Sequence, residues 1–208
     1  MNLSKSSLKY ETMRKLISKE LILNMENFII EEGAKQRSIA DSIEHKVKTI
    51  LMTTKMYDII KETLEPRGSK SIEDVTIVGK NDMTFYVDTK THNVNRKFSM
   101  PNLTSVEKLR NLFSHYDTEL IYVFVSYSVS DNYVNLLSFD VKYIWEIDVD
   151  CLRVGALGLG QLQIKDKNKP LKFVNISKLE WFNKLKTLVN IYHKKQIESI
   201  KKEMVKWV

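Results

Sequence analysis

The spacing of apolar residues in the first third of the chain predicts helices. Between about residues 7 and 30, leucine, isoleucine, methionine and phenylalanine recur at near-helical intervals, and Gly33 ends the pattern. A second helix is expected to begin at Ser38, which carries an N-cap side chain. It would place Ile39, Ile43, Val47, Ile50 and Leu51 on one apolar face. A third, short helix is expected over residues 57–64, because Pro66 to Ser69 would end it.

After residue 71 the pattern changes to one that is typical of β-strands. Two runs of β-branched and aromatic residues, Val75 to Val78 and Met83 to Val87, lie on either side of Gly79 to Asp82, which predicts a hairpin. The run Leu120 to Val125 is apolar at consecutive positions, as in a strand that is covered on both faces. A turn at residues 130–132 then leads into a further strand over 133–139.

The remaining elements are two helices and two short strands. Thr104 and Glu107 form a capping-box pattern that predicts a helix through Phe113. Ser177 and Glu180 form a second such pattern, which opens the last helix. Short strands are expected over residues 143–147 and 162–164.

Together these elements predict one α/β (α+β) domain, a mixed central sheet flanked by helices. Its helical part is expected over residues 1–66, a sheet core with the candidate site over 71–165, and a long basic helix over 177–206.

Composition narrows the class of protein. The 208 residues are 43% hydrophobic and 28% charged, which excludes disordered, collagen-like and coiled-coil classes. The longest apolar run has six residues, whereas a membrane helix needs ~20. A single cysteine, Cys151, excludes a disulfide framework and a cysteine-built zinc site. We therefore expect a cytoplasmic protein without a membrane partner. The G-x-x-G-x-G spacing of Gly155, Gly158 and Gly160 reverses the dinucleotide fingerprint, so no nucleotide cofactor is expected.

The net charge of +7 is unevenly distributed. Residues 165–206 contain twelve lysines and four acidic residues, whereas the rest of the chain carries a net charge of −1. Because lysines placed near phosphates release condensed counterions, this asymmetry indicates a polyanion as partner. A helix with a solvated charged face is the alternative.

Two aspartates and a lysine on the expected hairpin form the candidate site. Alternation places Asp88 and Lys90 on one face of the second strand. If the turn has three residues, 80–82, then Asp74 lies directly opposite Asp88, with Cβ atoms ~4.5–5.5 Å apart. Two carboxylates so close repel each other unless a proton or a cation lies between them. Mg²⁺, which prefers oxygen ligands, fits this gap.

These residue types suit phosphodiester hydrolysis. A metal held by the two carboxylates neutralises charge in the transition state and lowers the pKa of bound water, and Lys90 could hold or polarise that water. The alternative is a surface salt bridge, because a short D-x-K sequence also occurs by chance.

Asp74 with Asp88-Thr89-Lys90 resembles the core of the PD-(D/E)xK nuclease superfamily, and specifically its type II restriction endonucleases. The proline of the motif name is absent, because Ile72-Glu73 precede Asp74. The order of elements, with helices before the metal hairpin and a buried strand after it, is also similar. The resemblance implies Mg²⁺-dependent hydrolysis of double-stranded DNA at a short palindromic site, in the cytoplasm of a prokaryote.

The resemblance also implies roles for single residues. Asp74, Asp88 and Thr89 would hold the metal, and Lys90 would act in catalysis. The family often adds an acid from a helix before the hairpin, and Glu44 is the candidate here, the alternative being a solvated helix acid. A palindrome requires a two-fold symmetric reader, so we expect a homodimer.

Polar side chains around and after the second hairpin strand are candidates for contact with DNA, and so are two glutamines that follow the glycine-rich segment, where a plain loop before a strand is the alternative. Asn and Gln can form two hydrogen bonds with adenine, and Arg can do the same with guanine. Lysines and the N-termini of helices contact the DNA backbone instead, which positions the protein on the DNA without reading its sequence. An ordinary polar loop is the alternative. The candidates are Thr91, His92, Asn93, Asn95, Arg96, Lys97, Asn102, Thr104, Ser105, Gln161 and Gln163.

Two other functions stay open on the sequence alone. One is another nuclease of the same superfamily, such as a junction resolvase or a repair nuclease, which would act independently of base sequence. The other is a non-catalytic DNA-binding module, against which the intact set of Asp74, Asp88 and Lys90 argues.

Overall fold

The computed structural model describes residues 3–53, 59–66, 68, 71–96, 102–115, 117–155, 160–166, 169 and 171–207. The chain divides into two compact units. The first comprises residues 1–101 and 112–144, and the second comprises residues 102–111 and 145–208. Among the described residues, no helix is both long and apolar enough to cross a membrane.

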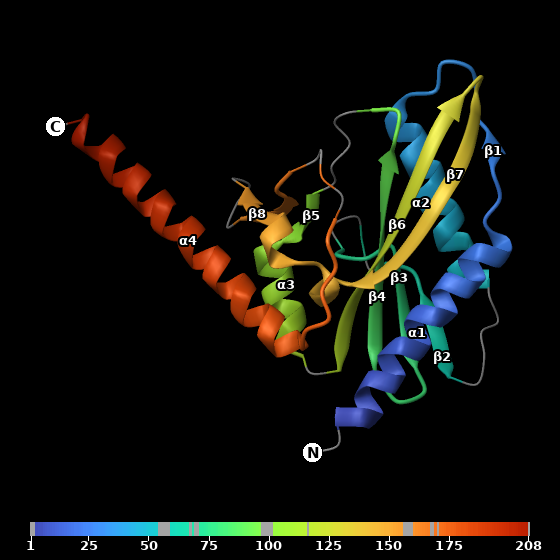
Figure 1. Ribbon diagram of the computed structural model, residues 1–208, viewed down its shortest axis with the longest axis horizontal. Coiled ribbons are helices and arrows are strands. Elements are labelled where there is room, and N and C mark those ends of the chain that lie inside the picture. Colours follow the sequence, from blue (N-terminus) through green and yellow to red (C-terminus); the bar gives the residue numbers. More distant parts are fainter. Residues whose placement is uncertain are drawn as a thin grey trace. The chain divides into compact units, whose positions relative to one another are not determined.

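The first unit is built on a six-stranded mixed sheet (Figure 1). Its strands lie in the order β1-β7-β6-β4-β3-β2, and β4 and β6 are parallel whereas the other neighbours are antiparallel. The helices α1 and α2 contact each other, α1 packs against β7, and α2 packs against β2, β3 and β4. The elements are α1 (Leu3–Asn24), β1 (Phe28–Ile29), α2 (Gln36–Thr53), β2 (Ile60–Leu64), β3 (Val75–Gly79), β4 (Thr84–Asn93), β6 (Thr118–Ser130) and β7 (Tyr133–Tyr143).

Strand β6 is the centre of this unit. Its residues from Glu119 to Val123 are buried without alternation, which confirms the prediction of a strand covered on both faces. The apolar face of α2 supplies a further part of the core, because Ile39, Ile43, Val47 and Leu51 are all buried. The sheet interior therefore combines a doubly covered strand with one amphipathic helix.

The hairpin of β3 and β4 has the register that the sequence predicts. Val75 pairs with Val87 and Val78 pairs with Thr84, so the turn contains residues 80–82. The Gly79 N–H donates to the Met83 carbonyl at 2.8 Å, and Asp82 adopts a φ of 61°. This left-handed residue closes the three-residue turn. The second turn, at residues 130–132, is also confirmed, with positive φ at Asp131 and Asn132.

The second unit contains a three-stranded antiparallel sheet in the order β5-β9-β8. Its elements are β5 (Asn102–Ser105), the start of α3 (Val106–Phe113), η2 (Val149–Cys151), β8 (Leu152–Gly155), β9 (Gln161–Ile164) and α4 (Lys178–Val205). Helix α4 packs against η2 and β8. Ser177 caps α4 as predicted, because its Oγ accepts from the Glu180 N–H at 3.1 Å. Trp181 is fully buried, and its Nε1 donates to the Ile147 carbonyl at 2.6 Å.

Three N-terminal predictions were wrong. The first helix ends at Asn24, and Phe28 and Ile29 form β1, which pairs with β7 about a hundred residues away. Ser38 lies inside α2, and its Oγ donates to the Lys35 carbonyl at 2.6 Å instead of accepting as an N-cap would. Residues 60–64 form the edge strand β2 rather than a helix, because pairing with β3 overrides local periodicity.

Two predictions nearer the C-terminus also changed. Thr104 is buried in β5, and it is Ser105 whose Oγ caps α3 by accepting from the Lys108 N–H at 3.1 Å. The expected strand over 143–147 is replaced by the 3₁₀ helix η1 (Ile144–Glu146), whereas the strand over 162–164 is confirmed as part of β9.

We predict that Trp181→Phe lowers the free energy of unfolding by about 1–3 kcal/mol, because the buried Ile147 carbonyl loses its donor. Chemical denaturation followed by circular dichroism measures the change. Trp207→Phe is the control, since Trp207 is 90% exposed, and a surface change of this kind shifts stability by ~0.5 kcal/mol or less. Equal effects of the two substitutions would contradict the structural role of Trp181.

Candidate functional site

Asp88 and Lys90 form an ion pair in the middle of β4. The alternation of the strand places both side chains on one face, and Lys90 Nζ lies 2.5 Å from Asp88 Oδ2. Asp88 is only 8% exposed. Apart from its contact with the Lys90 ammonium group, the buried Oδ2 of Asp88 has no hydrogen-bond partner among the described residues.

Asp74 lies beside this pair, directly before β3. Its Oδ2 accepts from the Thr89 N–H at 2.7 Å, and its own N–H donates to the Val87 carbonyl at 2.8 Å. The register of the hairpin, continued by one residue beyond Val75, brings Asp74 alongside Asp88. The backbone thus fixes one oxygen of Asp74 and leaves the other available to a ligand.

Glu44 reaches the same place from helix α2. Burial, with the negative charge of Asp74 as the next cause, raises the pKa of Glu44 to about 7, and the charge of Lys90 opposes the shift. Because charges shift the pKa of a neighbour mainly over short distances, Glu44, Asp74 and Lys90 lie in one electrostatic neighbourhood. The structure therefore brings Glu44 to the aspartates and Lys90, although its role there stays a prediction.

Asp88 shares this environment. Burial raises the pKa of Asp88 to about 7, the nearby charge and hydrogen bonding of Lys90 lower it, and the charges of Asp74 and Glu44 raise it again. Three carboxylates and one ammonium group therefore form a site with an excess of negative charge. A divalent cation that prefers oxygen ligands would relieve this repulsion.

The residues of the site fit an oxygen-coordinated metal in their chemistry, but they do not form a complete cage. Among the described residues, no three His, Cys, Asp or Glu side chains converge closely enough to hold a metal ion on their own. Alternation directs the Thr89 side chain to the opposite face from Asp88, and its buried Oγ1 has no hydrogen-bond partner within the ranges that the structure describes. The ligands on offer are thus the carboxylates of Asp74 and Asp88, with the Thr89 carbonyl.

Tyr122 is a residue of the site that the sequence did not indicate. It lies on β6 in register with Asp88, is fully buried, and has a hydroxyl group for which the described part of the chain offers no hydrogen-bond partner. Lys90 Nζ lies 5.9 Å from the centroid of its ring. Burial, followed by the charge of Asp88, raises the pKa of Tyr122, so its hydroxyl remains a donor. Only the parallel pairing of β4 and β6 identifies it, and no local motif marks that pairing.

Five of the predicted DNA-binding residues lie at the end of β4 or directly after it, and two of their amides have structural roles. Asn93 is buried, and its Oδ1 accepts from the Asn95 N–H at 3.0 Å. Asn95 Oδ1 accepts from the Val129 N–H at 3.4 Å. Thr91 and His92 are half-buried and Arg96 is exposed, while Lys97 lies outside the described residues.

The other predicted DNA-binding residues come together on the small sheet of the second unit. Asn102 pairs with Gln163 and Ser105 pairs with Gln161, which joins β5 to β9. Thr104 is the exception, because it is buried on the other face. Two of the three glycines near these strands, Gly155 and Gly160, are described, whereas Gly158 is not.

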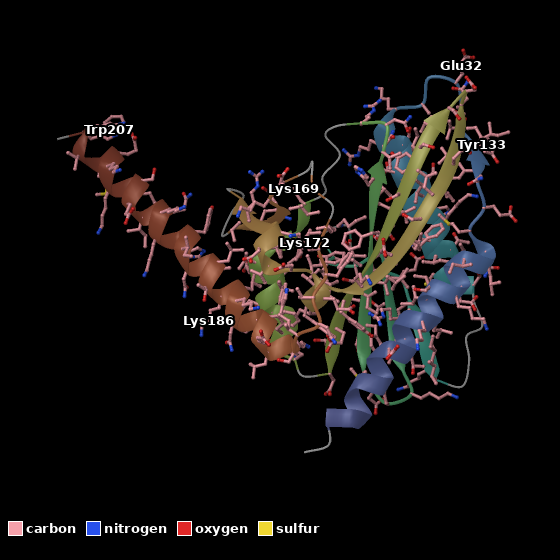
Figure 2. All side chains as sticks on the ribbon, in the orientation of Figure 1. Glu32, Tyr133, Lys169, Lys172, Lys186 and Trp207 are labelled. Carbon is pink, nitrogen blue, oxygen red and sulfur yellow. The ribbon has the colours of Figure 1, made fainter. Side chains whose placement is uncertain are left out.

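The lysines of the basic region are concentrated on α4 in the second unit. Figure 2 shows side chains projecting along this helix from Lys186 to Trp207 at its end. Lys194, Lys195, Lys201 and Lys202 are exposed, as a surface that binds a polyanion requires.

The comparisons with known proteins concern the fold. No protein-family model matches the chain, and no curated protein matches it. Among solved structures, the chain is similar to NlaIV restriction endonuclease, with a TM-score of 0.55 and 14% identity over 84% of this chain and 77% of that one. This likeness confirms the predicted α+β class and shows a restriction-endonuclease-like fold.

We predict that Asp88→Asn raises stability at pH 8. The folded state holds the Asp88 proton up to about pH 7, whereas the unfolded state releases it near the ordinary pKa of 3.8. Stability from this group is therefore present at low pH and is lost as the pH rises from about 4 to about 7. The neutral variant escapes that loss, and we expect a gain on the order of 1–4 kcal/mol at pH 8 and little gain at pH 4.

Thermal melts between pH 4 and pH 8 measure this difference. Asp82→Asn is the matched control, because Asp82 is exposed at the hairpin turn and asparagine tolerates its positive φ. A decrease in the stability of Asp88→Asn that is constant across the pH range would contradict the prediction, since it would mean that the ion pair with Lys90 outweighs burial of the carboxylate.

Proposed function

We propose that this protein is a metal-dependent endonuclease of the type II restriction class, which hydrolyses phosphodiester bonds in double-stranded DNA. The observation that carries the proposal is the buried Asp88–Lys90 pair, with Asp74 and Glu44 beside it, on a restriction-endonuclease-like fold. A buried carboxylate with a raised pKa and a specific charge partner is typical of functional sites. A structural ion pair would not require two further carboxylates against it.

Mg²⁺ is the proposed cofactor, and Asp74, Asp88 and the Thr89 carbonyl would hold it. Once bound, it would supply charge stabilisation to the phosphoryl oxygens and a lowered pKa to its water. Asp74 is already fixed for such a role, because the Thr89 N–H holds one of its oxygens. The Oδ2 of Asp88, whose polar contact among the described residues is the ammonium group of Lys90, offers a second ligand atom.

Lys90 and Glu44 have the remaining roles in the proposal. The ammonium group of Lys90, held at Asp88, would orient the attacking water and stabilise charge on the phosphate. Glu44, with a pKa of about 7, is matched to accept a proton at neutral pH and would contact the same water. Lys90 would act from β4, and Glu44 would act from α2, which packs against β4.

Homodimerisation completes the proposal. Cutting both strands of a palindrome requires two such sites related by a two-fold axis. We propose that exposed lysines of α4 bind the DNA backbone in each protomer, which provides affinity without sequence preference.

We predict that Asp74→Ala and Lys90→Ala reduce the rate of DNA cleavage in Mg²⁺ by at least ~100-fold, because each removes a group that acts on the transition state. Binding to DNA in Ca²⁺ should change much less. Plasmid nicking and gel-shift binding measure the two effects. Asp82→Asn and Lys61→Ala, at an exposed ion pair of 3.8 Å, are the matched controls and should cleave normally.

Each alternative function has a distinct outcome. Normal cleavage by Lys90→Ala would mean that Lys90 only forms a salt bridge with Asp88 and takes no part in catalysis. Cleavage whose mapped ends share no sequence would favour a repair nuclease or a resolvase. An absence of metal-dependent nicking in the wild-type protein, with DNA binding retained, would favour a non-catalytic binding module.

We also predict that replacing Lys194 and Lys195 with glutamine weakens binding to specific and random duplexes alike. The slope of log K against log salt should fall by ~0.9 for each phosphate that α4 no longer neutralises. Binding in Ca²⁺ across a salt series measures the slope. Lys61→Gln, on strand β2, is the control for removal of a surface charge, and the same slope in all variants would refute the assignment of α4.

A further inference from the structure

The small sheet of the second unit has two chemically different faces. Leu152, Leu162 and Ile164 are buried on one face. The register of β5, β9 and β8 places only polar residues and one glycine on the other: Asn102, Ser105, Arg153, Gly155, Gln161 and Gln163. All of these are half-buried or exposed, and none is acidic. This face is therefore rich in hydrogen-bonding groups and does not repel an anion.

Gln163 lies at the centre of the polar face. It is in register with Asn102 on one side and with Arg153 on the other. Its Nε2 donates to Asn102 Oδ1 at 2.7 Å, which fixes the two amides side by side. The rest of the Gln163 amide lies over Gly155, where an added Cβ would be 2.6 Å from Cδ of Gln163. Gly155 thus leaves the space in which the Gln163 amide lies.

The amides of Asn93, at the end of β4, and of Asn95, directly after it, are placed differently. Asn93 is buried, and the side-chain oxygens of Asn93 and Asn95 accept backbone hydrogen bonds within the first unit. Moving them to reach a base would break those bonds. On the small sheet, by contrast, the amides of Gln163 and Asn102 bond to each other, and they lie on a face that is half-buried or exposed.

We propose that this polar face reads base edges in the DNA major groove, with Arg153 and Gln163 as specificity-determining residues. The inference rests on the proposed function for DNA as the ligand. Glutamine and asparagine can bond adenine N6 and N7, and arginine can bond guanine O6 and N7. Three strands ~4.8 Å apart span ~10 Å, which matches a major groove ~12 Å wide.

Gly155→Ala provides the sharpest test. The variant leaves every polar group of the face in place, and the backbone of Gly155 does not have the left-handed φ that would strain an alanine. The new methyl group must displace the Gln163 amide, which is the end of a flexible side chain. If the position of that amide matters, specificity changes although the chemistry of the surface does not.

The experiment uses the full-length protein in four variants: Arg153→Ala, Gln163→Ala, Gly155→Ala and the control Arg110→Ala. Arg110 is exposed on α3 in the same unit and belongs to none of the three strands. Digestion of plasmid DNA of known sequence gives the wild-type site. Discrimination is then the ratio of cleavage rates in Mg²⁺, and of affinities in Ca²⁺, between that site and duplexes with one base pair changed.

We expect each of the three face variants to lower discrimination by about 5- to 150-fold, the equivalent of ~1–3 kcal/mol. Gln163→Ala and Gly155→Ala should bind random duplexes like the wild type, because neither changes the charge. Arg110→Ala should discriminate like the wild type. A thermal melt of each variant shows whether the fold is intact.

Two results would overturn the inference. In the first, the three face variants keep full discrimination whereas Arg96→Ala loses it. This result would assign the reading of bases to the residues that directly follow β4. In the second, the face variants lose specific and random binding together with thermal stability, which would make the face structural. The wild-type protein can also be used to select the sequences that it binds best from a pool of random duplexes. If it binds such sequences but cuts none of them, the proposed catalysis fails. The polar face is then still tested by comparing how the wild type and the variants discriminate between sequences in binding.

Discussion

The parallel pairing of β4 with β6 is the constraint on which the rest of the structure depends. It places Asp88 next to Tyr122 in the interior of the sheet, where burial leaves the carboxylate poorly solvated. Burial then raises the pKa of Asp88, and Lys90 on the same face supplies the only opposing charge among the causes of that shift. The electrostatics of the candidate site therefore follow from a pairing between strands that no local motif specifies.

In the proposed function, this burial sets the stability of the fold against catalysis. A protein whose purpose was stability alone would place an apolar residue at position 88, because charged carboxylates gathered in a sheet interior repel one another. The fold retains Asp74, Asp88 and Glu44 together, and offsets the cost with a doubly covered strand and the apolar face of α2. Sites of this kind are where local consistency between sequence and fold is expected to fail.

The sequence predicted the hairpin because its signals are local. The β-branched runs, the turn residues and the spacing of Asp74 and Asp88 all lie within fifteen residues, so period and turn length were sufficient. The contribution of α2 could be anticipated only as a candidate acid, Glu44. Elements that depend on distant pairing were missed: β1 pairs with β7, β2 pairs with β3, and Tyr122 meets Asp88 across two strands. For these, periodicity over short windows contains no information about the partner.

The three-residue turn at 80–82 also determines which changes of length the site tolerates during evolution. Asp74 and Asp88 are each seven residues from Asn81, so the turn is the centre of symmetry of the site. Deletion of one residue between Asn81 and either aspartate shifts the pairing by one residue. The aspartate on that side would then point to the opposite face of the sheet. The turn at 130–132 joins β6 to β7 beyond the site, and residues inserted there leave the pairing of β4 with β6 unchanged. The site therefore tolerates insertions in the turn between β6 and β7, but not in the turn between β3 and β4.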